Sequence, residues 1–381
     1  MTPAQLLKKA KRIVFKFGTN ALSTESGDLA LSRLYSFMED LAALRAQGKE
    51  IIVVTSGAVG MGKRVLGLTQ TDGVSTKQAC AAVGQIGLMK FYERGFKELG
   101  VVCAQVLLTE DDFADRARYL SLRDTLNRLL ELGCIPVINQ NDTVSTNELR
   151  AYKDKGVKVC FSDNDKLAAL VTAGMDGDLL CILSDVEGLY NADPRKNKTA
   201  KRLDVVQNIT PEIEALGFCA SSRGRGGMKT KLEAAKIVTR AGAAMVIAYG
   251  KRGGAVSALW GEDFKGTLFL PTADLPGRKL WLAYATNVAG GVRVNAGAVK
   301  ALREKGSSLL PIGITGVAGA FERGDAISIL DQQDREIARG LTNYSSQDCA
   351  KLAGCSSAEI AKKIGSNNYD EVVHRDNIVL L

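Results

Sequence analysis

The stretch VVTSGAVGMGKRVLG, from Val53 to Gly67, joins a hydrophobic run to a glycine-rich turn. Residues Gly57 to Lys63 match the G-x-x-x-x-G-K pattern of a phosphate-binding loop. The next residue of such a loop is Ser or Thr, which binds magnesium, but here it is Arg64. The segment therefore predicts a strand, a glycine turn and a helix, without a true P-loop.

The glycines Gly57, Gly60 and Gly62 leave two interpretations open. Because glycine has no side chain, these positions let backbone N–H groups approach an anionic ligand. An ordinary tight turn from a strand into a helix also uses glycine. Ser56, at the end of the strand, adds a hydroxyl group to the turn.

The same alternation of strands and helices extends outward through residues 12–249. Short apolar runs rich in Val and Ile are typical of strands that are buried on both faces. Such runs are RIVFKF (12–17), EIIVVT (50–55), VVCAQVLL (101–108), CIPVIN (134–139), DLLCIL (178–183) and AAMVIAY (243–249). Helical stretches lie between them, for example at 31–48 and 229–242. This order predicts an α/β fold with a doubly wound, mainly parallel sheet.

The pattern changes at FLPTADLPGRKLW, residues 269–281, where two prolines and a glycine predict a linker. Short strand-like pieces follow, separated by glycine-rich turns: GGVRVNAGA, GITGVAGAFERGDAISILD and REIARGLTNY. We therefore expect residues 1–270 to form the first domain and residues 276–381 a small, mostly β domain.

Composition is typical of a soluble globular protein. The chain has 381 residues, of which 46% are hydrophobic and 24% are charged. Its eight cysteines form no C-x-x-C pair, so we expect reduced thiols and a cytoplasmic protein. We expect neither a signal peptide nor a membrane span, because no apolar run is long enough for one.

The formal net charge of +8 indicates an anionic partner. Residues 276–381 carry 13 Lys or Arg and 11 Asp or Glu, a net +2, so +6 of the +8 lies in the remainder. This distribution favours a small anionic substrate over a nucleic acid bound at the C-terminal end. The single histidine, His374, argues against a histidine-based triad and against a histidine metal site.

Polar, glycine-containing segments follow several of the predicted strands. They are KFGTNALS (16–23), TSGAVGMG (55–62), NQNDTVSTNE (139–148) and SDVEGLYNADPR (184–195), and RGRGGMKTK (223–231) opens a helix. The carboxyl ends of parallel strands meet at one edge of a sheet, so these loops are expected to converge on one crevice.

Three lysines stand in unfavourable positions unless an anion is near. Lys16 lies inside an apolar strand, where an unpaired ammonium group is costly. It either reaches water from an edge strand or faces a phosphoryl group at the strand end. Lys229 and Lys231 fall in the first turn of a helix, where the dipole disfavours cations. A bound anion would offset this effect, and simple solvation of the lysines is the alternative.

Asp163, Asn164 and Asp165 open another predicted helix, and four polar residues, 139–142, end a strand. One such residue suffices to cap a helix. The excess favours ligand contact for part of the set.

Taken in order, these segments resemble the amino-acid kinase family, and most closely its members that phosphorylate the γ-carboxylate of L-glutamate in proline biosynthesis. The matching motifs are KFGTNALS, IVVTSGAVGMG, STKQACAAVGQIGLM, RDTLNRLLELGCIPVINQNDTVST, FSDNDKLAALVT, LSDVEGLYNADPR and GRGGMKTKLEAAKIVTRAG. The tail GSSLLPIGITGVAGAFERGDAISI resembles the PUA domain of many such kinases. The resemblance covers nearly the whole chain and implies the amino-acid kinase fold followed by a PUA domain.

The resemblance also implies roles for individual residues. Lys16 and Lys231 would contact the transferring phosphoryl group, and Asp165 would orient both lysines. The amino acid would be bound by Ser56, Gly57, Asn139, Asp142, Asp163 and Asn164. ATP would be bound by Lys16, Ser184, Asp185, Arg225, Gly226, Gly227, Met228, Lys229, Thr230 and Lys231. No residue is assigned to a metal, because Mg²⁺ would be held mainly by phosphates and water.

Three residues depart from the family pattern. Gln140 replaces a common acidic residue, Ser162 a common glycine, and Arg225 a common small residue. We expect the last two to alter loop flexibility or charge near ATP without changing the reaction.

The family further implies a homo-oligomer, either a dimer or a tetramer, that hands its product to glutamate-5-semialdehyde dehydrogenase. One alternative is another amino-acid kinase, acting on aspartate, N-acetylglutamate or carbamate. The other is an RNA-binding protein that acts through the PUA domain, which the near-neutral tail disfavours.

Overall fold

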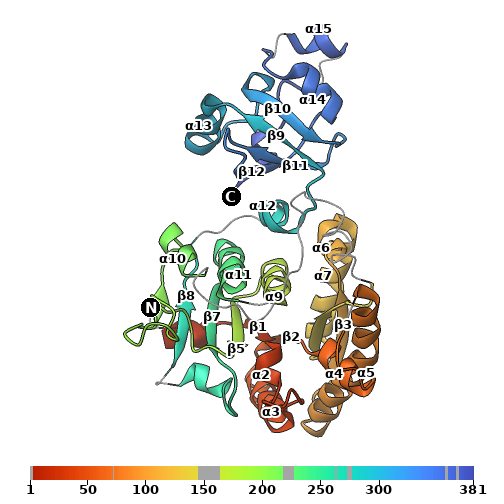
Figure 1. Cartoon of the computed structure of the whole chain (residues 1–381), viewed down its shortest axis with the longest axis vertical. Helices are drawn as coiled ribbons and strands as arrows, with labels where there is room; N and C mark the ends of the chain where they lie inside the picture. Colours follow the sequence, from red (N-terminus) through yellow and green to blue (C-terminus); the bar gives the residue numbers. More distant parts are fainter. Residues whose placement is uncertain are drawn as a thin grey trace. The chain divides into compact units, whose positions relative to one another are not determined.

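The computed structural model describes residues 3–71, 73–144, 164–217, 227–261, 264–272, 277–356, 359–365 and 369–381. The chain forms two compact units, which divide between residues 275 and 276. Each unit has its own β-sheet and its own hydrophobic core (Figure 1). Among the described residues, none of the helices combines the length and the hydrophobicity that a membrane crossing requires.

The N-terminal unit is built on an eight-stranded sheet with the order β3-β4-β2-β1-β5-β7-β8-β6. Its strands are β1 (Arg12–Phe17), β2 (Glu50–Val54), β3 (Cys103–Leu108), β4 (Ile135–Gln140), β5 (Leu179–Ser184), β6 (Val205–Val206), β7 (Ala244–Tyr249) and β8 (Gly266–Phe269). Neighbouring strands are parallel, except that β7 and β8 are antiparallel. The predicted mainly parallel sheet is confirmed.

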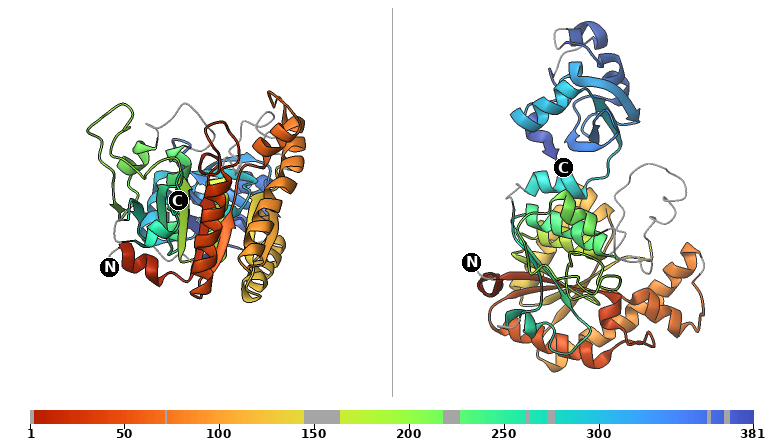
Figure 2. Two further views of the ribbon diagram at one scale, coloured as in Figure 1. Left: turned by 90° about the horizontal axis from the view of Figure 1, so that it is seen from below. Right: turned by 60° about the vertical axis from the view of Figure 1, so that its left-hand side comes forward.

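Helices cover both faces of this sheet, as expected for a doubly wound fold (Figure 2). They are α1 (Pro3–Lys9), α2 (Thr19–Leu22), α3 (Leu31–Ala46), α4 (Ala58–Val65), α5 (Val74–Glu98), α6 (Asp111–Ala114), α7 (Arg116–Glu131), α9 (Asn164–Gly174), α10 (Pro211–Leu216), α11 (Met228–Arg240) and the short 3-10 helix η1 (Ser257–Trp260). Helices α9 and α11 pack side by side on one face, and α3 lies on the other (Figure 1).

Strand β1 shows why a central strand is apolar at nearly every position. Ile13, Phe15 and Phe17 belong to the core that α3 covers, and Phe17 stacks on Phe37 of α3 with ring centroids 4.8 Å apart. Because side chains alternate along a strand, Lys16 points to the opposite face, toward α9. β1 lies between β2 and β5, and Lys16 is 3% exposed. The interpretation of Lys16 as an edge-strand residue reaching water is therefore wrong.

Two parts of the sheet differ from the sequence interpretation. β3 was expected to be buried on both faces, but it is an edge strand, and most of its residues are only partly buried. The short strands β6 and β8 were not predicted. β8 ends at Phe269, and helix α12 (Gly277–Leu280) lies within the other end of the segment 269–281. The two ends of the predicted linker therefore belong to regular elements.

Helices α4 and α5 cross with their backbones in contact. A Cβ atom on Gly62 would lie 1.7 Å from the carbonyl oxygen of Cys80, and one on Gly84 would lie 1.8 Å from that of Ala58. A Cβ atom on Gly60 would meet nothing within 4 Å. Gly62 is thus required for helix packing, and the interpretation that it lets the backbone approach a ligand is wrong. The crossing holds the start of α4 in place.

We expect Gly62→Ala to lower the free energy of unfolding by about 2–3 kcal/mol, because the two backbones would have to separate. Gly60→Ala, in the same helix, is the matched control. It should be neutral or stabilising by up to about 1 kcal/mol, because alanine has the higher helix propensity. Urea unfolding measures both variants. Equal stability of the two would show that the crossing tolerates a methyl group.

The C-terminal unit contains a five-stranded sheet with the order β10-β9-β11-β12-β13. Its strands are β9 (Gly290–Val294), β10 (Ile314–Gly319), β11 (Ala326–Leu330), β12 (Glu336–Leu341) and β13 (Ile378–Leu380). Its helical elements are α12, the π-helical turn η2 (Trp281–Ala285), α13 (Ala296–Lys305), η3 (Pro311–Gly313), α14 (Ser346–Leu352), α15 (Ile360–Ile364) and η5 (Arg375–Asn377). The small, mostly β second domain is confirmed.

A buried arginine connects η2 to the sheet of this unit. Arg339 of β12 donates to the carbonyl oxygen of Ala283 at 2.9 Å and pairs with Glu336 at 2.8 Å. His374 caps the short helix η5, where its side chain accepts from the backbone of Asp376. The single histidine thus has a local structural role in the C-terminal unit.

Candidate active site

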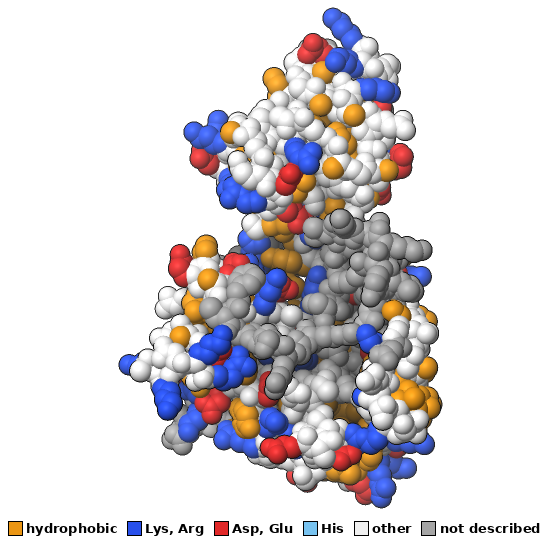
Figure 3. Space-filling view, in the orientation of Figure 1, with side chains coloured by type: hydrophobic (Ala, Val, Ile, Leu, Met, Phe, Trp, Pro, Cys, Tyr) orange, Lys and Arg blue, Asp and Glu red, His pale blue; other side chains and the backbone are white. Residues whose placement is uncertain are grey.

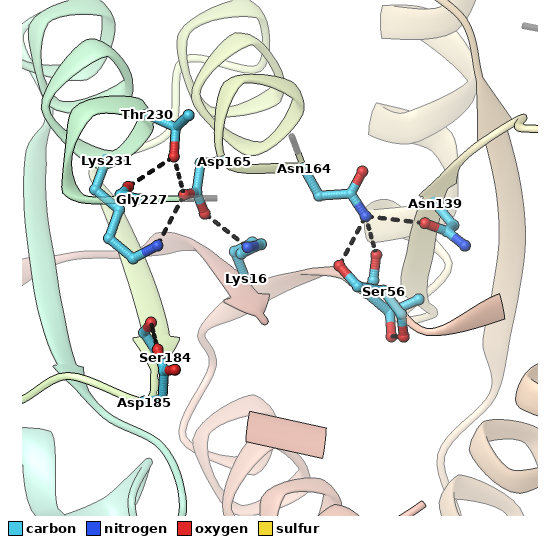
Figure 4. Close-up of polar contacts among 11 residues, drawn as sticks. Lys16, Ser56, Asn139, Asn164, Asp165, Ser184, Asp185, Gly227, Thr230 and Lys231 are labelled. Carbon is cyan, nitrogen blue, oxygen red and sulfur yellow. Dashed lines mark hydrogen bonds and ion pairs between the residues drawn. The ribbon is translucent and has the colours of Figure 1, made fainter. Parts of the chain in front are cut away.

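The carboxyl ends of β4, β2, β1 and β5 meet at one edge of the sheet, because these neighbouring strands are parallel. Helices α9 and α11 begin at the same edge (Figure 4). The polar side chains placed there are Lys16, Ser56, Asn139, Asn164, Asp165, Ser184, Asp185, Thr230 and Lys231. Residues from separate parts of the chain therefore form one site.

Asp165 joins Lys16 and Lys231 in a buried ion trio. Its Oδ1 lies 2.7 Å from Nζ of Lys16, and its Oδ2 lies 3.0 Å from Nζ of Lys231. Thr230 donates a further hydrogen bond to Oδ2 at 3.0 Å. The Asp165 side chain is fully buried, and the two lysine side chains are nearly so. One carboxylate thus sets the position of both ammonium groups.

Electrostatics keeps Asp165 ionised. Burial alone would raise the pKa of its carboxyl group, but the ammonium groups of Lys16 and Lys231 outweigh burial and lower the pKa below its ordinary value. Two ammonium groups and one carboxylate give the trio a net charge of +1. The trio is therefore suited to bind an anion between fixed positive charges.

Asn164 precedes Asp165 in the first turn of α9. Its side chain contacts residues at the ends of β2 and β4. Its Nδ2 donates to the backbone carbonyl of Thr55 at 2.6 Å and to Oγ of Ser56 at 2.8 Å. The same nitrogen lies 3.1 Å from Oδ1 of Asn139. These bonds tie the ends of β2 and β4 to the start of α9. Ser56, Asn139 and Asn164 are called the amide half of the site below.

A second carboxylate, Asp185, follows β5. Its oxygens accept hydrogen bonds from Asn20 at 2.8 Å and from Ser184 at 3.0 Å. Partial burial would raise its pKa, but these bonds, a backbone hydrogen bond and the Lys231 ammonium together lower the pKa. Asp185 is therefore an ionised group on the α11 side of the site.

A cavity of about 290 Å³ opens beside the amide half. It lies between α4, α5 and the ends of β3 and β4, and its polar lining includes Gln85, Gln140, Asn141 and Asp142. Gly57 precedes α4 with a φ of +108°, a conformation that favours glycine. A Cβ atom on Gly57 would meet nothing within 4 Å. The glycine turn is therefore open on its outer side.

The remaining predicted residues have varied positions. Gly227 precedes α11 and accepts a hydrogen bond from Thr230, whereas Met228 is buried and Lys229 is exposed. Asp142 lines the cavity and not the ion trio. The predicted residues Asp163, Arg225 and Gly226, and the departure Ser162, lie outside the described residues. Within the described ranges, no group of three His, Cys, Asp or Glu side chains is placed to hold a metal.

Sequence reasoning missed three contributors to the site. Asn20 binds Asp185, the backbone carbonyl of Thr55 binds Asn164, and Gln85 binds Asn139 at 2.9 Å. Asn20 stands in a polar strand-end segment, which is a usable signal. The other two carry no local signal, because one acts through its backbone and the other lies in the middle of α5.

Two family models match the chain. Residues 11–249 match the model of the amino acid kinase family, and residues 290–364 match the PUA domain. The glutamate 5-kinase of Caldanaerobacter subterraneus subsp. tengcongensis is 44% identical over 373 residues, which are 97% of this chain and 98% of that protein. The glutamate 5-kinase of Trichlorobacter lovleyi is 46% identical over 379 residues, 99% of this chain and 98% of that protein.

The chain also aligns with the solved structures of two kinases. Carbamate kinase from Giardia lamblia, bound to AMP-PNP, is 15% identical with a TM-score of 0.48, and the match covers 69% of this chain and 99% of that one. UMP kinase from Ureaplasma parvum is 12% identical with a TM-score of 0.46 and the same two coverages.

Proposed function

This chain belongs to the amino acid kinase family and, within it, to the glutamate 5-kinases, and from that membership we propose its reaction. The γ-carboxylate of L-glutamate attacks the γ-phosphorus of ATP. A bond forms between the carboxylate oxygen and phosphorus, and the bond from phosphorus to the β–γ bridging oxygen breaks. The products are L-glutamyl 5-phosphate and ADP, and the reaction is the first step of proline biosynthesis.

The ion trio is the observation that supports this proposal most. A carboxylate is already ionised at neutral pH, so the attack needs no general base. The chain's single histidine, His374, lies in the C-terminal unit, which agrees with a reaction that needs no histidine base. The main obstacle is repulsion between a carboxylate and a triphosphate. Lys16 and Lys231 supply fixed positive charges where the phosphoryl oxygens gain negative charge, and Asp165 holds both in place.

We assign the two substrates to opposite sides of the trio. L-glutamate occupies the amide half and the adjoining cavity, with its γ-carboxylate directed at Lys16. ATP occupies the side of Ser184, Asp185 and the start of α11, where the helix N-terminus favours phosphate. Asn164 and Asp165 link the two sides, since Asn164 bonds to Ser56 and Asp165 bonds to the two lysines.

We further propose that Mg²⁺ accompanies ATP and is held mainly by phosphates and water. The donor set fits such binding. Both oxygens of Asp165 are engaged by lysines, and Asp185 accepts from Asn20 and Ser184, so neither offers an open carboxylate cage. When bound, the cation would offset negative charge on the triphosphate.

The product is an acyl phosphate, which water hydrolyses readily. We therefore propose that the product is handed promptly to a glutamate-5-semialdehyde dehydrogenase. We also propose that the protein is cytoplasmic and forms a homo-oligomer, either a dimer or a tetramer. The cysteines among the described residues are all free, which suits a reducing compartment.

Asp142 is proposed to bind the α-ammonium group of glutamate, because it is an acidic residue that lines the cavity. Asp142→Ala should raise the KM for L-glutamate about 10- to 100-fold, the usual effect of removing a hydrogen bond to a charged group. The KM for ATP should stay within about twofold and serves as the internal control. An unchanged KM for glutamate in steady-state assays would contradict this role.

ATP turnover with L-glutamate tests the proposed function. Hydroxylamine traps the acyl phosphate as a hydroxamate, which identifies the carboxyl group as the acceptor. Parallel reactions with L-aspartate, N-acetyl-L-glutamate and carbamate distinguish other amino-acid kinases. ADP release with one of these acids, and none with L-glutamate, would overturn the proposal.

RNA binding through the C-terminal unit is the second candidate, and the PUA match favours it. Against it, Lys and Arg are interspersed with Asp and Glu on the face of that unit seen in Figure 3. Non-specific RNA affinity depends on clustered positive charge. Tight, salt-sensitive retention of RNA in a filter-binding assay would support this candidate.

A further inference from the structure

The backbone fixes the direction of two side-chain amides next to the cavity. The N–H of Gln140 donates to Oδ1 of Asn139 at 2.9 Å. Since a backbone N–H can only donate, that atom must be the amide oxygen, and Nδ2 is the atom of Asn139 that meets Gln85. The atom of Gln85 that accepts from it, 2.9 Å away, is therefore Oε1.

This chain of bonds leaves the amide nitrogen of Gln85 unused. Gln85 is 8% exposed, and its Nε2 is buried without a hydrogen-bond partner among the described residues. Unpaired buried donors are costly and uncommon in native proteins. Gln85 also lines the cavity described above. The unused donor therefore belongs to a side chain in the cavity wall, where a small rotation of the amide would bring it to a hydrogen-bond acceptor of a bound molecule.

We propose that Nε2 of Gln85 donates a hydrogen bond to the α-carboxylate of the amino acid, which makes Gln85 a specificity-determining residue. This inference rests on the proposed function, because it takes glutamate as the acceptor substrate. Glutamate has two carboxylates, and its γ-carboxylate must lie at the ion trio for transfer. The α-carboxylate is the acceptor that remains for the cavity.

The other polar groups of the cavity agree with this orientation. Asp142 lines the same space, and its carboxylate would attract a cation bound there. A donor from Gln85 and a carboxylate from Asp142 together complement an α-carboxylate and an α-ammonium group. The cavity therefore selects a free α-amino acid. N-acetylglutamate has a neutral amide in place of the ammonium group, and carbamate has neither α-group.

Comparison of L-glutamate with 4-aminobutyrate tests the contact, because 4-aminobutyrate is glutamate without its α-carboxylate. In the wild type, kcat/KM should strongly favour glutamate. Gln85→Met keeps the length of the side chain and removes the donor. It should reduce this preference about 10- to 100-fold, mainly through a lower kcat/KM for glutamate. Where turnover of 4-aminobutyrate is below detection, its inhibition constant against glutamate gives the same comparison.

The variant Gln85→Glu tests whether Gln85 acts by binding the substrate or only by holding the side chain of Asn139. It keeps an acceptor for Asn139 and replaces the donor with a carboxylate. At pH 8 it should lower kcat/KM for glutamate more than Gln85→Met does, and change 4-aminobutyrate much less. Lys90→Met is the matched control, because Lys90 is an exposed residue of the same helix, α5, and does not line the cavity. The ratio of kcat/KM for L-glutamate to that for 4-aminobutyrate should stay within about threefold of the wild-type ratio, since substitutions at exposed positions usually have small effects.

One outcome would overturn the inference about Gln85, and a different outcome would overturn the proposed function on which it rests. If the Gln85 variants slowed both substrates by the same factor, Gln85 would act only by supporting Asn139, and the inference would be wrong. If the wild type failed to phosphorylate glutamate at all, the proposed function itself would fail.

Discussion

Lys16→Met and Lys231→Met should each lower kcat about 100- to 1,000-fold, the usual effect of removing one electrostatic stabiliser of a transition state. Each substitution removes an ammonium group that lies within 3.0 Å of Asp165 at the proposed point of phosphoryl transfer. The phosphoryl oxygens gain charge only in the transition state. The loss should therefore appear in kcat more than in the KM for glutamate, as measured by hydroxamate formation.

Lys236→Met is the matched control for these two variants. Lys236 lies in the same helix as Lys231, and its Nζ is 2.6 Å from Glu214 in a partly exposed ion pair. Its kcat should stay within about twofold of the wild type, because exposed pairs contribute little. Circular dichroism checks that all three variants are folded. Near-normal turnover by both active-site variants would show that the two lysines are wrongly assigned.

Asp165→Asn should destabilise the N-terminal unit by about 3–5 kcal/mol at neutral pH, because it leaves two buried ammonium groups without their carboxylate. Urea unfolding measures this loss. Asp204→Asn is the control, since Asp204 forms an exposed ion pair with Arg202 at 2.8 Å. That substitution should cost no more than about 1 kcal/mol. A loss for Asp165→Asn as small as that of the control would contradict the trio's proposed importance.

The stability difference between the wild type and Asp165→Asn should also depend on pH. The native pKa of Asp165 lies below that of an unfolded carboxyl group, which is about 3.9. The contribution of the carboxylate is therefore complete above that pH and is lost as the pH falls toward the native pKa. The two proteins should converge in stability below about pH 4. A constant difference between neutral and acidic pH would contradict the lowered pKa.

The local sequence pattern predicted the central strands, because strands that are buried on both faces are apolar at consecutive positions. β1 and β2 are buried on both faces, so they are apolar at consecutive positions, and the one charged residue in β1 after Arg12, Lys16, marks the site. β3 is also mostly apolar but lies at an edge of the sheet, which no local pattern reveals. β6 has two residues and β8 has four, too few for a recognisable period.

The site was less predictable because its contacts join distant parts of the chain. A charge inside an apolar strand indicated Lys16, strand-end position indicated Ser56, and the excess of polar residues indicated Asn164. Asp165 contacts both lysines because α9 packs against β1 and against α11, and no local sequence pattern reveals this packing. The unused nitrogen of Gln85 depends on an entire hydrogen-bond network, which only the folded arrangement defines.

Asn164 and Asp165 are consecutive residues in one helical turn, so neither can shift without the other (Figure 4). Asn164 is bonded to Ser56, and Asp165 to Lys16 and Lys231. A small tilt of α9 that improved the fit around the acceptor would also move the ammonium groups around the donor. The two affinities are then energetically linked, and such linkage is reciprocal. Whatever factor saturating glutamate applies to the dissociation constant of ATP, saturating ATP must apply to that of glutamate.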